Sequence, residues 1–140
     1  MIETETVQSL PGTFAHTSAL PGSQALAAVG RLARGATQTE VDAVLADAAL
    51  TEGYDAEAVL ALANAALAVD ELGTVDSVAL FSASDGPAPA DVHVSAAGDP
   101  APIILQADAT AVPPQRSVAL GPGSSVLLSS DRALVRITVA

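Results

Sequence analysis

Apolar positions along the chain change their spacing near Thr74. Between residues 23 and 73 they recur every three or four residues, a spacing that places them on one face of a helix. From Thr74 onward they alternate with polar residues, and Pro, Gly and Ser separate the runs, which is typical of short strands. The pattern therefore predicts an α+β protein, in which helices precede a small antiparallel β sandwich or barrel-like sheet.

Three short, Ala-rich helices are expected, and each has a recognisable start. A Ser, Thr or Asp at the start accepts a hydrogen bond from an amide of the first turn, and a following Glu can complete a capping box. A Gly after the last turn favours the end of a helix. The expected helices are about 24–34 between Ser23 and Gly35, a second from the capping box Thr37–Glu40 to about Leu50, and a third from Asp55 to a stop at Leu72 and Gly73.

Six strands are expected in the second half of the chain. The last two form the clearest hairpin, because only a short polar connection at residues 130–132 separates them. In the final strand alternate residues are apolar, with Val135, Ile137 and Val139 on the face expected to pack inward and Arg136 and Thr138 on the other. The expected strands are 75–81, 91–95, 102–106, 116–120, 125–129 and 133–139.

Residues 1–22 have no helical period and contain Leu-Pro-Gly twice, which favours an extended or turning backbone. We interpret this segment as an extended N-terminal arm, and a disordered terminus is the alternative. The segment carries large apolar side chains that a solvated tail would lack and that could dock on a partner: Leu10, Phe14 and Leu20. The chain is thus divided into the arm 1–22, a helical segment 23–73 and an antiparallel β domain 74–140.

Charge and composition exclude several classes of function. The chain has no Lys, Cys or Trp, and its formal net charge is −11. Lys and Arg supply most of the affinity for phosphates, so this charge argues against nucleic-acid binding. The longest apolar run, Val59 to Val69, is much shorter than the roughly 20 residues of a membrane helix, and the acidic N-terminus does not resemble a signal peptide. We expect no membrane partner.

The expected core is poor in large side chains, since Phe14, Tyr54 and Phe81 are the only aromatic residues. A buried Val or Leu contributes about 1.5 to 3 kcal/mol, and a buried Ala contributes far less. A lone monomer of this size would therefore have modest stability. Self-association into a homo-oligomer is expected to compensate.

No group of residues meets the requirements of a catalytic or metal site. Asp91 and His93 share one side of an expected strand, but two ligands do not make a metal site, and a solvent-facing polar pair is the simpler interpretation. Catalysis by Ser, His and Asp would need His16 or His93 as the base, and no Gly-x-Ser-x-Gly elbow exposes a serine. We expect no enzyme activity and no cofactor.

The stretch from Pro113 to Ala140, together with the acidic extended N-terminus and the lack of lysine, resembles small accessory proteins of tailed phages that infect GC-rich bacteria. In particular, it is similar to capsid decoration, or cement, proteins. The resemblance covers about the last third of the chain. It implies a structural protein without catalysis, made in the host cytoplasm and bound to the major capsid protein on the surface of the phage head.

The resemblance also implies a trimer whose extended termini reach neighbouring subunits. Under this hypothesis Leu10, Phe14 and Leu20 would lie across partner subunits, and Arg136 would face a neighbour. A stand-alone binding module, whose β domain recognises a small ligand or a host surface, is the alternative. A decoration protein should sediment with capsids, whereas a binding module should behave as a free monomer.

Overall fold

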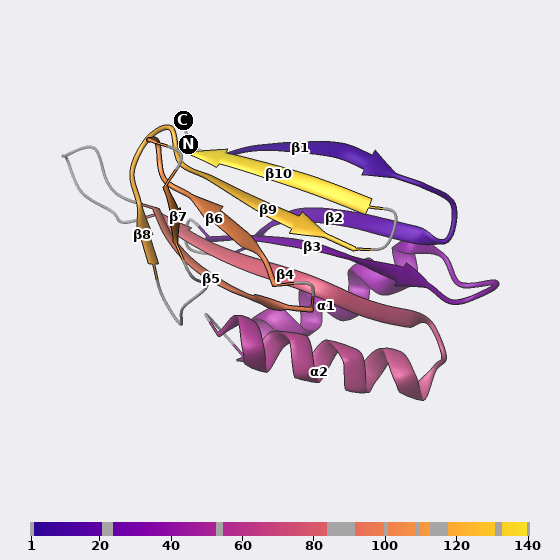
Figure 1. Cartoon of the computed structure of the whole chain (residues 1–140). Coiled ribbons are helices and arrows are strands. Elements are labelled where there is room, and N and C mark those ends of the chain that lie inside the picture. Colours follow the sequence, from indigo (N-terminus) through magenta and orange to yellow (C-terminus); the bar gives the residue numbers. More distant parts are fainter. Residues whose placement is uncertain are drawn as a thin grey trace.

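Two antiparallel sheets and a pair of helices form three stacked layers in the computed structural model (Figure 1). We call the sheet between the other two layers the central sheet. Its strand order is β2 (Thr13–Leu20), β3 (Gln24–Leu32), β4 (Gly73–Ala83), β5 (Val92–Gly98) and β8 (Val118–Leu120). The second sheet, here the outer sheet, has the order β1 (Ile2–Ser9), β10 (Ala133–Val139), β9 (Ser125–Ser129), β6 (Ile103–Leu105) and β7 (Ala111–Val112).

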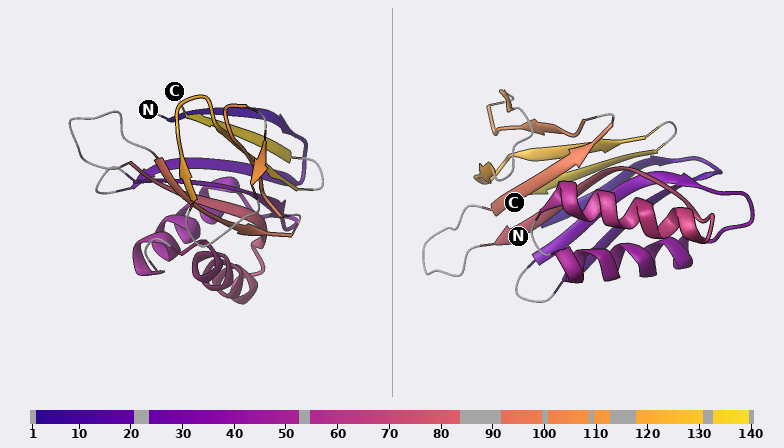
Figure 2. Two further views of the ribbon diagram at one scale, coloured as in Figure 1. Left: turned by 60° about the vertical axis from the view of Figure 1, so that its left-hand side comes forward. Right: turned by 90° about the horizontal axis from the view of Figure 1, so that it is seen from below.

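Helices α1 (Gln38–Glu52) and α2 (Ala56–Val69) lie side by side across the central sheet, on the side away from the outer sheet (Figure 2). The structure describes residues 2–20, 24–52, 55–83, 92–99, 101–108, 110–112, 118–130 and 133–139. The predicted α+β class with an antiparallel β part is confirmed. The sheets do not close into a barrel, and the number of helices in the described ranges is two instead of the expected three.

The expected helix over residues 24–34 is wrong, because Gln24–Leu32 form strand β3 of the central sheet. Leu26 and Ala28 pack under the helices, whereas Ala27 and Val29 pack against the outer sheet. A strand that is buried on both faces has no polar face, so its sequence is a continuous apolar run. Such a run of Ala, Leu and Val cannot be distinguished from a buried helix by its periodicity.

The other two helices begin where their capping residues predict. The capping box is formed, since the amide of Thr37 donates to Glu40 Oε1 at 3.1 Å and the amide of Glu40 donates to Thr37 Oγ1 at 3.4 Å. Asp55 caps α2 by accepting from the amides at the first turn. Helix α2 ends at Val69, before the expected stop at Leu72 and Gly73, and the chain turns away through Glu71 at a φ of 53°.

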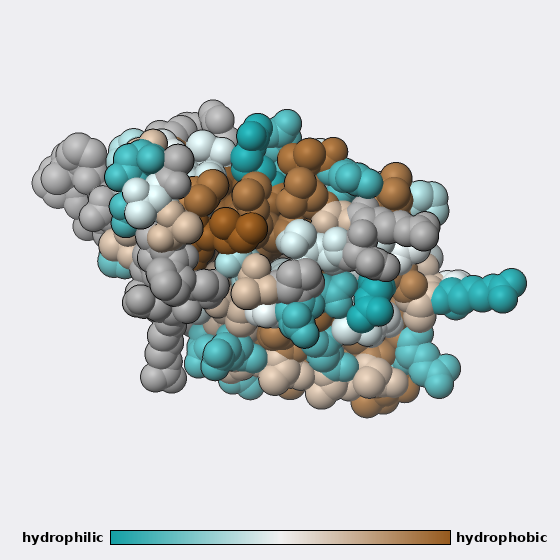
Figure 3. All heavy atoms as spheres, in the orientation of Figure 1, coloured by the Kyte–Doolittle hydropathy of each residue, from teal (hydrophilic) through white to brown (hydrophobic). Residues whose placement is uncertain are grey.

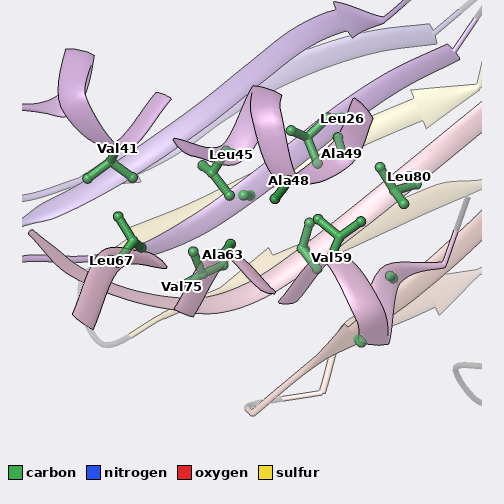
Figure 4. Packing of buried hydrophobic residues seen from close by; sticks show 14 of the residues in the cluster. Leu26, Val41, Leu45, Ala48, Ala49, Val59, Ala63, Leu67, Val75 and Leu80 are labelled. Carbon is green, nitrogen blue, oxygen red and sulfur yellow. The ribbon is translucent and has the colours of Figure 1, made fainter. Parts of the chain in front are cut away.

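Small and medium apolar side chains fill the layer between the helices and the central sheet (Figure 4). Val41 and Leu45 of α1 and Val59, Ala63 and Leu67 of α2 are fully buried against Leu26, Val75 and Leu80 of the sheet. Asn64 also ties α2 to the sheet, because its side chain accepts from the amide of Val75 at 2.7 Å and donates to the carbonyl of Val75 at 3.1 Å.

The described part of the expected arm, residues 2–20, is extended, as expected, but it is not an appendage. Strand β1 pairs with β10 along the outer sheet, and β2 pairs with β3 along the central sheet. Phe14 is fully buried among the residues under the helices, where its ring packs over Gly30. A Cβ on Gly30 would lie 2.7 Å from that ring and closer still to the backbone carbonyl oxygen of Thr74, so this position requires glycine. Strands from the expected arm and from the expected β domain therefore share both sheets.

The strands of the second half follow the prediction to different degrees. The hairpin of β9 and β10 is confirmed residue for residue, and Val135, Ile137 and Val139 are buried between the sheets. Strands β4 and β5 extend beyond the expected ends, β6 is shorter, and β7 was not expected. Asp91 and Arg116, which were expected to begin strands, lie outside the described residues.

Candidate functional site

His16 lies between strand β2 and helix α1 and contacts a polar group through each ring nitrogen. Its Nδ1 atom is 2.8 Å from Asp42 Oδ1 on α1, and its Nε2 atom is 3.1 Å from Ser18 Oγ on the same strand. The residue as a whole is only 8% exposed. The structure thus brings together a carboxylate, an imidazole and a hydroxyl, in that order.

Burial lowers the pKa of His16 below its ordinary value of 6.5, because the cost of desolvating the charged ring outweighs the opposing influence of Asp42. The ring is therefore neutral at neutral pH. The Oδ1 atom of Asp42 is fully enclosed, and the described residues offer it no hydrogen bond of ordinary geometry, although His16 Nδ1 lies 2.8 Å away. A buried carboxylate oxygen needs a donor, so we assign the proton of His16 to Nδ1.

A second polar contact also joins α1 to β2. The side-chain amide of Gln38 donates to the backbone carbonyl of Ala15 at 2.9 Å. The register of β2 explains why this carbonyl is free to accept. The amide of Leu32 donates to the carbonyl of Gly12, so the backbone groups of Gly12 and of every second residue after it point toward β3. Ala15 is not one of these residues, and its carbonyl points away from β3. The intervening residues direct their backbone groups to the outside. Among the described strands, β2 pairs only with β3, so it presents an open backbone edge next to His16 and Ser18.

A second candidate surface is the outer face of the outer sheet, the side turned away from the central sheet. Directly opposed residues share a face of a sheet, and a row of them crosses four strands: Glu5, Arg136, Leu127 and Ile103. Arg136 and Glu5 form an ion pair, with about half of each side chain exposed. Ile103 is 50% exposed, so it is one of the large apolar side chains that the described surface leaves open to solvent.

More apolar side chains flank this row. Leu105 and Leu134 lie beside the row on the same face, and both are half-buried, as is Leu127 within the row. Hydrophobic surface gathers over β6, β9 and β10 in Figure 3. We call the set of Glu5, Ile103, Leu105, Leu127, Leu134 and Arg136 the outer face. Among the described elements, both helices lie on the other side of the molecule, so neither of them covers the outer face (Figure 2).

The residues predicted to contact a partner do not lie together. Leu10 is 41% exposed in the turn between β1 and β2, and Arg136 lies on the outer face. Phe14 is fully buried in the core, so it offers no surface to a partner. Leu20 ends β2, and its side chain lies outside the described residues.

The other sequence candidates remain isolated. His93 is exposed on β5, and Asp91 lies outside the described residues. Within the described ranges, no three His, Cys, Asp or Glu side chains cluster as metal ligands would. No helix in the described part of the chain is long and apolar enough to span a membrane.

Two hollows on the described surface are modest. The first, of about 230 Å³, lies between the sheets and is lined by residues that include Thr4, Thr17 and Phe81. The second is an open depression of about 390 Å³, next to Arg31 and Glu71. Small-molecule sites typically enclose about 300 to 1,000 Å³ and bury most of their ligand. The first hollow is smaller than this range, and the second lies within it but is too open to bury a ligand.

From the sequence, His16 and His93 are the two possible bases for catalysis by Ser, His and Asp, and the partners of His16 are not revealed. Ser18 follows at the spacing that places two residues on one side of a strand, but the segment was interpreted as an arm. Asp42 lies on a helix well separated in sequence, and no local pattern links the two. Comparison with known proteins adds no partner or activity, because no family model, curated protein or solved structure matches the chain.

Proposed function

We propose that this protein is a structural accessory protein of a phage head, which binds the shell through its outer face and needs no catalysis to do so. The observation that carries the proposal is the unequal covering of the molecule. The central sheet is covered on both sides, whereas the outer face exposes Ile103 and parts of three leucines. Exposed apolar surface of this kind is typical of sites that bind another protein.

The distribution of charge also supports the outer face as the surface that binds a partner. Arg136 and Glu5 neutralise each other within the exposed row, while the chain as a whole carries a net charge of −11. The stretch from Glu40 to Glu71, which contains α2 and all of α1 but its first two residues, holds eight carboxylates and no basic residue. Electrostatic repulsion between this chain and another acidic protein surface should therefore be smaller at the outer face than at the helices.

The phage shell is proposed as the partner because of the resemblance of the C-terminal stretch to capsid decoration proteins. This stretch contains β9 and β10, which supply Leu127, Leu134 and Arg136 to the outer face. The exposed turn at Leu10 is a second proposed contact. Phe14 is not proposed again, because it belongs to the core. Assembly as a trimer would let three weak contacts act together.

The experiment uses phage heads that lack the protein, purified from a strain in which its coding sequence has been disrupted. The full-length chain is added back and sedimented with the heads. Ile103→Asp places a charge on the outer face and should weaken binding at least tenfold. The matched control is Val69→Asp on α2, where an apolar side chain is 81% exposed on the helical side.

Binding that is unchanged by Ile103→Asp, or weakened equally by both variants, would remove the outer face from the proposal. A wild-type chain that stays in the supernatant as a monomer would contradict the shell as partner. That result would favour the stand-alone binding module instead.

A further inference from the structure

We propose that Ser18 is a nucleophile activated by His16 and Asp42, and that it accepts acyl groups from activated carboxylic esters. This reactivity is independent of attachment to a shell. It makes Ser18 either a site of covalent acylation or, if the acyl group is then released to water, the nucleophile of a slow esterase.

The geometry of the three side chains carries the inference. A serine nucleophile requires a base within hydrogen-bond reach and a third group that orients the base. His16 Nε2 lies 3.1 Å from Ser18 Oγ, and His16 Nδ1 lies 2.8 Å from Asp42 Oδ1. Because these atoms come from a strand and a packed helix, the arrangement is held by the core beneath α1.

The protonation state of the His16 imidazole also suits a general base. The enclosed Oδ1 atom of Asp42 favours the proton of His16 on Nδ1. The lone pair of Nε2 then faces Ser18 Oγ and can accept its proton. Desolvation of the ring lowers the pKa of His16, so the base is free at neutral pH.

The open edge of β2 provides access and hydrogen-bond donors. Ser18 is half-buried, and β2 is the last strand of the central sheet within the described residues. The register directs the backbone amides of Thr17 and Ala19 outward along this edge, on either side of Ser18. Outward amides of this kind can stabilise the negative charge on an attacked carbonyl oxygen.

Transfer of the acyl group from the ester to Ser18 needs no cofactor. Ser18 Oγ forms a bond to the carbonyl carbon of the ester, and its proton passes to His16 Nε2. The bond between the carbonyl carbon and the leaving oxygen then breaks, and the departing alcohol takes the proton from Nε2. Attack by water on the acyl-serine, with the proton transfers repeated, would release a carboxylic acid and restore Ser18.

A purely structural interpretation is that the same contacts only fasten α1 to β2. The two interpretations differ in whether Ser18 reacts faster than an ordinary serine. Labelling with a fluorophosphonate, which forms a stable bond to activated serines, therefore distinguishes them. The full-length protein is treated with the probe, and the adduct is located by peptide mass spectrometry.

The expected result is an adduct on Ser18, with a labelling rate that rises with pH as His16 loses its proton. Ser129, which is half-buried on β9, is the reference serine and should remain unlabelled. His16→Gln and Asp42→Asn should each slow the labelling of Ser18, His16→Gln by roughly a hundredfold or more. Circular dichroism identifies which of these variants keep the fold. If His16→Gln unfolds, the labelling rate of Asp42→Asn alone tests whether Ser18 is activated.

Labelling of Ser18 no faster than that of Ser129 would overturn the proposal, as would a rate that the folded variants leave unchanged. Incubation with p-nitrophenyl acetate then distinguishes the two fates of the acyl group. A stable acetyl group on Ser18 identifies a modification site, and continued release of p-nitrophenol that is absent in Ser18→Ala identifies an esterase. Ser18→Ala should bind phage heads as the wild type does, so this proposal and the attachment proposal fail separately.

Discussion

Truncation of Ile137 should destabilise the protein far more than truncation of its neighbour Arg136. Ile137 is fully buried between the two sheets and lies opposite Thr4 and Val126. Ile137→Ala removes three carbon groups, at about 0.8 kcal/mol each for lost burial. The cavity that remains raises the expected loss to about 2 to 5 kcal/mol.

Arg136→Ala removes only an exposed ion pair with Glu5, since about half of each side chain is open to solvent. Pairs of this kind contribute less than about 1 kcal/mol. For a chain of 140 residues each kcal/mol corresponds to about 3 °C in Tm. We therefore expect Tm to fall by roughly 6 to 15 °C for Ile137→Ala and by no more than about 3 °C for Arg136→Ala.

Thermal unfolding followed by circular dichroism measures both variants, and urea unfolding supplies the free energies. Similar small losses for the two variants would refute the reasoning. A shift of one residue in the register of β10 would exchange its two faces, so Arg136 would then point into the core.

Three further predictions concern other contacts. The pKa of His16 is lowered in the folded state, so the unfolded chain binds a proton more readily, and the free energy of unfolding should decline as pH falls from 7 to 5. Urea unfolding at each pH measures this decline, and His16→Gln should remove the part of it that His16 causes. Asn64→Leu leaves the amide and carbonyl of Val75 unpaired and should cost roughly 1 to 3 kcal/mol for each group, measured by urea unfolding. Gly30→Ala forces a methyl group against the backbone carbonyl of Thr74 and the ring of Phe14, and it should lower Tm by several degrees, as about 1 to 3 kcal/mol of strain predicts.

Elements with a local signal were predictable from the sequence. The hairpin of β9 and β10 alternates strictly between buried and half-exposed residues, so both its bounds and its inward face could be assigned. Helices α1 and α2 each begin at a capping residue, Thr37 or Asp55, whose hydrogen bonds depend only on residues in the next turn.

Elements that depend on distant partners were not predictable. Strand β3 is apolar on both faces because a helix layer and a sheet cover it, and neither layer can be inferred from residues 24–32. Strand β1 is rich in alternating Glu and Thr and becomes a strand by pairing with β10 at the other end of the chain. The contact of His16 with Asp42 likewise exists only once α1 has packed on β2.

The orientation of the protein on a phage head tests the central claim most directly. Electron cryomicroscopy of heads with the full-length chain added back would locate both helices relative to the shell. We predict that the outer sheet, with Ile103 and Arg136, lies against the shell, and that α1 and α2 point away from it. Helices that lie against the shell, or heads that carry no density for the protein, would contradict the account.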